Sequence, residues 1–210
     1  MRNFFDTPFY HMLCTIFDMV ILNACFLICC LPFVTIGAAV SALHRTFYDV
    51  QKGEGSALKD FFRFFRSALK KGVPGWLLWV ILFAIACADL FIVGLMWNFS
   101  ARYLILGILA GIILLLLLTG STLFPILSYY RSLRQAAKDA LRFSVCHLLR
   151  VVPVCLLNLV PLLLLLFWMY GLFLLLAVFV LIWFSLSAYV SVFLLKPVLQ
   201  QAESQLYDLK

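Results

Sequence analysis

The sequence predicts an all-α, polytopic membrane protein with about five transmembrane helices, and three observations support this. Hydrophobic residues make up 66% of the 210 residues and charged residues only 12%, whereas soluble domains are roughly 45–50% apolar and about 25% charged. Five apolar stretches have about the length needed to cross a bilayer. Basic residues gather in the segments between them. We therefore expect a single integral membrane domain over residues 1–210, because five spans leave no room for a soluble domain.

The expected spans follow from the apolar stretches, since backbone groups in lipid must be satisfied within a helix. They cover residues 13–43, 73–97, 103–130, 151–168 and 172–195. A straight helix over the first stretch would be roughly 46 Å long, against a hydrocarbon core of ~30 Å. Pro32 interrupts it, and Gly37 follows. We predict a kink at Pro32, and a re-entrant hairpin turning at Pro32–Gly37 is the alternative.

Lys and Arg predict the orientation of the chain. Fourteen of the sixteen lie in residues 44–72, residues 131–150 and the C-terminal tail, and only Arg2 and Arg102 lie on the other side. By the positive-inside rule the two basic segments and the C-terminus are cytoplasmic, and the N-terminus is outside. The first apolar run is too long for a cleaved signal peptide, so we expect it to be retained. The net charge of +7 thus reflects topology, and we expect no nucleic-acid partner.

An internal repeat relates the two basic segments. When the chain is shifted by 79 residues, Ala57–Leu78 aligns with Ala136–Leu157, and ten positions are identical. The repeated unit keeps its orientation, so it predicts a parallel repeat with an axis along the membrane normal, and the fifth span begins a third copy. Small residues occur in the first, third and fifth spans and predict that these three form an inner bundle. These residues are Gly37, Ala38, Ala39, Ser41, Gly120, Ser121, Thr122, Ser185, Ser187, Ala188 and Ser191.

The segment from Ser56 to Lys71 has a helical pattern with an apolar and a basic face. Apolar residues recur at the spacing of one helix face, and basic residues occupy the opposite face. One interpretation is an interfacial helix lying flat on the bilayer, with cations at anionic headgroups. The other is a coupling surface for a cytoplasmic partner. The candidate partner or lipid contacts are Phe61, Phe62, Arg63, Phe65, Arg66 and Lys70.

Polar groups inside the spans are few, and they are usually placed toward a partner or water. Asp89 and Asn23 are expected at similar depth and form a candidate polar site for a cation, a proton or a sugar hydroxyl. The structural interpretation is an Asp89 that snorkels to the interface and an Asn23 that bridges helices. With the repeat, this pair favours a second hypothesis, a small-solute carrier or channel for a sugar or an ion that works as an oligomer.

Enzymatic motifs are missing from the sequence. There is no HExxH, GxSxG, phosphate-binding loop or paired-carboxylate arrangement, and lone histidines do not make a metal site. The seven cysteines lack metal-ligand spacing and are interpreted as packing residues. We therefore expect no catalytic residues, no metal, no cofactor and no enzymatic activity.

Several short runs resemble the signature of the YesL-like family of small bacterial membrane proteins. The runs are Ile21–Asn23, Cys29–Pro32, Thr35–Ala39, Ala42–Leu43, Phe61–Phe65 and Ser187–Tyr189. The resemblance covers nearly the whole chain, although only its N-terminal run is specific. It implies a multi-pass protein of the bacterial plasma membrane, of unknown function and linked to carbohydrate uptake or utilisation. It supplies no catalytic residues. The first hypothesis, motivated by the pair of basic amphipathic helices, is an accessory protein that binds a partner such as a sugar ABC transporter or a membrane sensor.

Overall fold

The computed structural model describes residues 8–53, 56–95, 102–130, 132–166 and 173–207. Over these ranges the chain is all helical, with seven α-helices and one short 3₁₀ turn. The elements are α1 (Pro8–Cys30), η2 (Phe33–Thr35), α2 (Ile36–Gln51), α3 (Ala57–Leu95), α4 (Arg102–Leu127), α5 (Leu133–Cys146), α6 (Leu148–Leu166) and α7 (Phe173–Tyr207).

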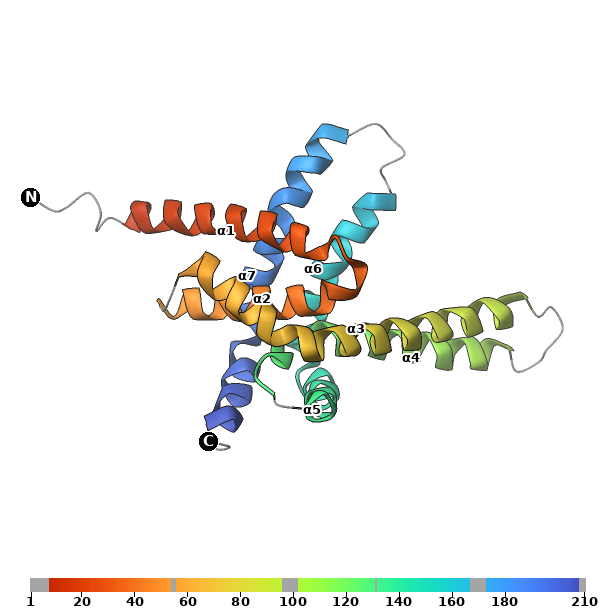
Figure 1. Cartoon of the computed structure of the whole chain (residues 1–210). Coiled ribbons are helices and arrows are strands. Elements are labelled where there is room, and N and C mark those ends of the chain that lie inside the picture. Colours follow the sequence, from red (N-terminus) through yellow and green to blue (C-terminus); the bar gives the residue numbers. More distant parts are fainter. Residues whose placement is uncertain (1–7, 54–55, 96–101, 131, 167–172, 208–210) are drawn as a thin grey trace, which may run out of the picture.

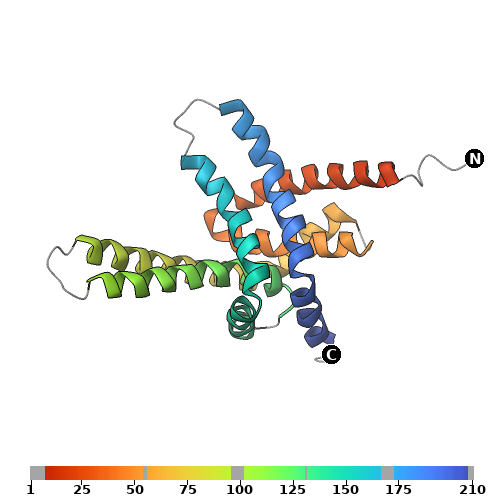
Figure 2. The ribbon, with the colours of Figure 1, turned by 180° about the vertical axis from the view of Figure 1, so that it is seen from behind.

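Successive helices pair into hairpins that diverge from a common centre. Figures 1 and 2 show α3 and α4 lying side by side as one arm, and α6 and α7 forming a second arm that points in another direction. Helix α5 is short, and the chain turns by 106° where it passes into α6. The centre, where α2 meets α3, α4 and α7, therefore holds the molecule together.

Within the described residues, three helices are long and apolar enough to cross a membrane. They are Ala57–Leu95, Tyr103–Leu127 and Trp183–Glu203, and a fourth is added if the bent α5–α6 pair counts as one span. A multi-pass membrane protein with several apolar helices is therefore supported, with three or four candidate spans in place of the five that we predicted. Part of the expected boundary between the fourth and fifth spans lies at 167–172, outside the described residues.

The first predicted span is a helical hairpin and does not continue through a kink. Helix α1 ends at Cys30, and α2 returns alongside it in the opposite direction (Figures 1 and 2). Pro32 has extended backbone angles, with φ −76° and ψ 112°, and it lacks the N–H that a continuing helix needs. The predicted kink at Pro32 is therefore wrong, and the structure contains the hairpin that was the alternative.

Helix α3 joins two segments that the sequence analysis separated. The amphipathic segment and the second predicted span form one helix of 39 residues that continues through Pro74. The amphipathic segment is therefore not a separate helix. Two glycines, one on each helix, allow α2 and α3 to pack closely. A Cβ on Gly72 would lie 2.6 Å from the Ala38 Cα, and a Cβ on Gly37 would lie 2.7 Å from the Gly72 carbonyl oxygen. Gly37 thus allows α2 and α3 to cross closely and does not mark a kink.

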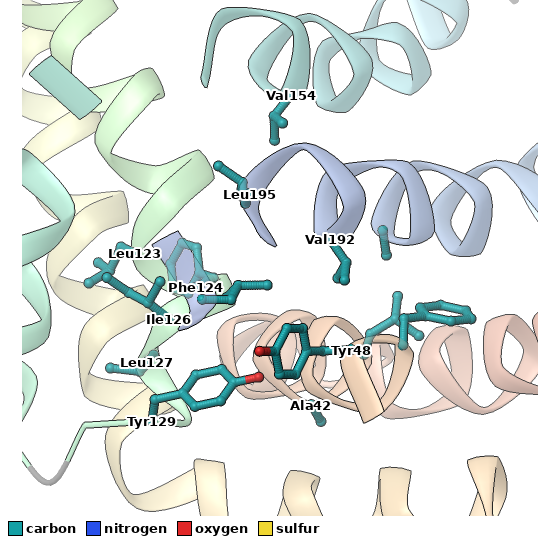
Figure 3. Close-up of a cluster of buried hydrophobic side chains, with 14 of the residues drawn as sticks. Ala42, Tyr48, Leu123, Phe124, Ile126, Leu127, Tyr129, Val154, Val192 and Leu195 are labelled. Atoms are coloured by element: carbon teal, nitrogen blue, oxygen red, sulfur yellow. The ribbon is translucent and has the colours of Figure 1, made fainter. Parts of the chain in front are cut away.

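The hydrophobic core is built around α2, α4 and α7. Figure 3 shows Phe124 and Ile126 of α4 facing Val192 and Leu195 of α7, with Tyr48 of α2 close by. Most of the small residues named above are buried, and α2, α4 and α7 contact one another. These three helices therefore meet at the centre, together with α3, and an inner bundle of three spans remains a prediction.

The cysteines whose surroundings are described are free thiols. Cys155 is buried in the core, as expected of a packing residue. Cys146, at the end of α5, is exposed, so the packing interpretation is wrong for this position. The side chain of Cys14 lies outside the described residues.

Candidate functional site

The two polar residues predicted inside the spans occupy different environments. Asn23 is fully buried on α1, within the central core. Asp89 is exposed on α3. Helix α3 meets the α1–α2 turn near Trp76, where the rings of Phe33 and Trp76 are 5.7 Å apart. Asp89 is thirteen residues further along α3, about 20 Å at 1.5 Å per residue, so the structure does not bring Asp89 and Asn23 into one site.

The N-terminal third of α3 has one face turned into the protein. Phe61 is fully buried, and Phe64 and Asp60 are also buried. The Asp60 carboxylate accepts a hydrogen bond from the Ser56 N–H at 2.8 Å and pairs with Arg63 at 2.9 Å, which fixes the start of the helix. The prediction of Phe61 as a surface contact is therefore wrong, because its ring packs in the core.

The opposite face of this segment is basic with an apolar centre. Phe62 is 49% exposed and lies among cationic side chains. Phe65 is less exposed than Phe62. This exposed set, which we call the α3 basic face, consists of Lys59, Phe62, Arg63, Arg66 and Lys70. Most of its residues lie three, four, seven, eight or eleven positions apart, and so share one side of the helix. Four of the six predicted contacts therefore lie at the surface.

Helix α5 presents a smaller surface of the same kind. Lys138, Leu141 and Arg142 are exposed, and they stand 79 positions after Lys59, Phe62 and Arg63. The opposite side of α5 is buried at Ala136, Ala140 and Ser144, where Ser144 Oγ is 2.8 Å from Thr122 Oγ1 of α4. Both basic segments thus place a cation, an apolar side chain and a second cation at the surface. The repeat itself remains a prediction.

A polar cluster at the end of α2 was not found from the sequence. The Glu203 carboxylate of α7 accepts hydrogen bonds from Tyr48 Oη at 2.9 Å and from Lys52 Nζ at 2.7 Å. Partial burial alone would lower the pKa of Lys52, but its hydrogen bonds to Glu203 and Tyr48 raise that pKa. Gln51 Nε2 also donates to the Tyr189 carbonyl oxygen at 3.0 Å. The last turns of α2 are therefore held to α7 at two places fourteen residues apart on α7.

Arg45 extends this cluster to α3 and α4. Its guanidinium lies between two rings, 4.7 Å from the centroid of Phe64 and 4.5 Å from that of Tyr129. It also donates a hydrogen bond to the Ser128 carbonyl oxygen at 2.9 Å. The sequence predicts Arg45 and Lys52 only as cytoplasmic charges, and no spacing signal links either to Glu203, 151 positions beyond Lys52.

The chemistry available to these surfaces is recognition. In the described part of the chain, no three His, Cys, Asp or Glu residues lie close enough together to hold a metal ion. The polar cluster is engaged in contacts between helices. The α3 basic face is exposed, and its pattern of cations around an aromatic ring suits an anionic surface with an apolar element.

Comparison with known proteins gives one match. The family described as "Protein of unknown function, DUF624" matches residues 19–90, which contain most of α1, all of η2 and α2, and α3 as far as Leu90. No curated protein and no solved structure matches the chain significantly. The matched segment includes the α1–α2 hairpin and the α3 basic face. The match covers the N-terminal runs that carry the resemblance seen in the sequence, and over residues 19–90 the chain is similar to this family.

Proposed function

We propose that this chain is a non-enzymatic accessory protein of the membrane that binds a partner through the α3 basic face. The observation that carries the proposal is the contrast between the two sides of α3. Phe61 and Phe64 fix the segment to the core, while Phe62 and Arg66 are left exposed. Burying an aromatic ring with flanking cations is a common way to form a protein interface.

The biological setting of the proposal comes from the family. The resemblance to YesL-like proteins implies a link to carbohydrate uptake or utilisation, so a sugar ABC transporter or a membrane sensor is the class of partner that we propose. The partner surface should be acidic where it meets Lys59, Arg66 and Lys70, because like charges across an interface are destabilising. No cofactor is needed for this role.

The carrier hypothesis receives less support. It depended on Asp89 and Asn23 forming one polar layer, but Asp89 is exposed on the α3–α4 arm and Asn23 is buried in the core. A polar path through the chain would need these groups, or others in the described residues, to line a shared space. The accessory role is therefore the function that we propose.

The test is affinity purification from native membranes in mild detergent, with mass spectrometry of the retained proteins. We expect a stoichiometric transporter or sensor subunit with the wild-type chain, and its loss with Phe62→Ser and with Arg66→Glu. Lys196→Glu is the matched control, because Lys196 is exposed on α7, away from the α3 basic face. Size-exclusion chromatography shows whether each variant remains folded.

Two results would count against the proposal. A partner that stays bound to folded Phe62→Ser and Arg66→Glu variants would place the interface elsewhere. A homo-oligomer that retains only anionic lipid would show that the basic face serves the bilayer and binds no partner protein.

A further inference from the structure

The turn of the α1–α2 hairpin is apolar and exposed. Leu31 is 82%, Phe33 59% and Val34 42% exposed, and Pro32 between them is also exposed. The chain carries no Asp, Glu, Lys or Arg at residues 19–44. Consecutive exposed apolar residues at a turn are unusual in water, where turns are rich in polar residues. Such a tip is suited to an apolar surrounding.

Two backbone N–H groups of the turn and the Thr35 hydroxyl donate hydrogen bonds to carbonyls of the same turn. The Leu31 N–H donates to the Ile28 carbonyl at 3.3 Å, and the Thr35 N–H donates to the Pro32 carbonyl at 3.0 Å. The Thr35 hydroxyl lies 2.6 Å from the Cys29 carbonyl oxygen and 2.7 Å from that of Pro32. Lipid tolerates a break in a helix only where such groups are satisfied within the protein, since each unsatisfied group costs several kcal/mol.

The contacts of the α1–α2 turn with helix α3 indicate how deep in the bilayer this turn lies and on which side. The tip meets α3 at Trp76, through Phe33, just beyond the last basic residues of the α3 segment, Lys70 and Lys71. From there α2 runs back along α3, and its Arg45 lies over the Phe64 ring. Figures 1 and 2 show α2 returning beside α1, so that α1 begins on the side of the molecule opposite to the outer ends of α3 and α4.

We propose that the α1–α2 hairpin enters the bilayer from the cytoplasmic side, places Leu31–Val34 in the hydrocarbon, and returns to the same side. Helix α2 has 16 residues, about 24 Å, which is shorter than the ~30 Å core. The spanning helices are then α3, α4, α6 and α7, and both ends of the chain are cytoplasmic. This topology replaces the expected outer N-terminus.

The distribution of charge agrees better with the new topology. With the start of α1 on the cytoplasmic side, Arg2 joins the other basic residues there, and Arg102 alone of the sixteen Lys and Arg stays outside. The positive-inside rule is most reliable for charges close to the ends of the apolar segments. The inference is independent of the proposed partner function, because it concerns only how the chain meets lipid.

The first test locates the two ends of the full chain. Epitope tags with a protease site are placed before Met1 and after Lys210, and cleavage is compared in right-side-out and inverted membrane vesicles. The C-terminal tag serves as the internal reference for the cytoplasmic side. We expect both tags to be cleaved only in inverted vesicles. Cleavage of the N-terminal tag in right-side-out vesicles would overturn the proposal and restore a first span that crosses the bilayer.

The second test asks whether the tip lies in lipid. Leu31→Glu and Leu31→Ala are compared after reconstitution into phospholipid vesicles, and Leu58→Glu is the control at an exposed position on the cytoplasmic part of α3. We expect the thermal unfolding midpoint to fall by several degrees with Leu31→Glu only, because a charge in the hydrocarbon is unfavourable. Equal midpoints for Leu31→Glu and Leu31→Ala would show that the tip is in water.

Discussion

The crossing of α2 and α3 gives the sharpest prediction for stability. A Cβ added at Gly72 would lie 2.6 Å from the Ala38 Cα and 2.7 Å from the Ala38 N. Carbon atoms in contact prefer about 3.5–4.0 Å, so the two backbones would have to separate by about 1 Å. Both contacting atoms belong to the main chain and cannot rotate away. We expect Gly72→Ala to lower the free energy of unfolding by about 1–3 kcal/mol, the usual range for overpacking.

The matched control is a glycine in a helix with open surroundings. A Cβ at Gly111 on α4 would meet nothing within 4 Å, and alanine favours a helix over glycine by up to ~1 kcal/mol. Gly111→Ala should therefore be neutral or stabilising in thermal unfolding of the purified protein in detergent. Adding Ala38→Gly to Gly72→Ala should restore part of the stability, because it removes a third close contact at 2.9 Å. A Gly72→Ala protein as stable as Gly111→Ala would refute the close crossing.

Three further outcomes are expected from the polar cluster and from α2. Arg45→Lys should lower the thermal midpoint, because lysine loses the planar stacking between two rings; an unchanged midpoint would mean that the stacking contributes nothing. A double-mutant cycle with Lys52→Gln and Glu203→Gln should give a coupling below ~1 kcal/mol that weakens with salt, since both side chains are partly exposed. Burial lowers the pKa of His44 to about 4 from 6.5, so protonation of His44 has no effect on stability above pH 6.5 and lowers the free energy of unfolding as the pH falls toward 4. When the free energy of unfolding is measured against pH, His44→Gln should lose roughly 3 kcal/mol less than wild type over this range; an equal loss would contradict this.

The burial of the small residues could be predicted because such residues have a specific use in membrane helices. Ser187 and Ala188 of α7 are buried, like Gly37 and Gly72 at the crossing of α2 and α3. At the two glycines a larger side chain would hold the neighbouring helices apart. The pattern is local, so the sequence alone carries it.

Burial on the amphipathic part of α3 could not be predicted in the same way. Phe61 and Phe62 are adjacent and chemically identical, yet one is fully buried and the other is half exposed. An apolar face meets either lipid or protein, and both surroundings favour the same residues. Only contacts with distant segments decide between them, such as the Arg45 stacking on Phe64.

Pro32 was ambiguous for a related reason. Proline ends the hydrogen-bond pattern of a helix but does not fix the direction in which the chain continues. The direction here depends on Thr35, whose hydroxyl lies within hydrogen-bonding distance of the Cys29 and Pro32 carbonyls, and on the room that Gly72 leaves for α2. Neither effect is visible as a periodicity.

The two basic segments show how similar sequences reach different geometries. Four pairs of aligned residues are buried in both segments. They are Ala57 with Ala136, Phe61 with Ala140, Gly72 with Val151 and Gly75 with Val154. Helix α3 is continuous across Arg66–Ala68. In the aligned residues Val145–His147, by contrast, helix α5 ends at Cys146. Valine, cysteine and histidine are weaker helix formers than arginine, serine and alanine, by about 1 kcal/mol over the three positions. That difference is small, but it is comparable to one tertiary contact, and it falls where the 106° turn between α5 and α6 occurs.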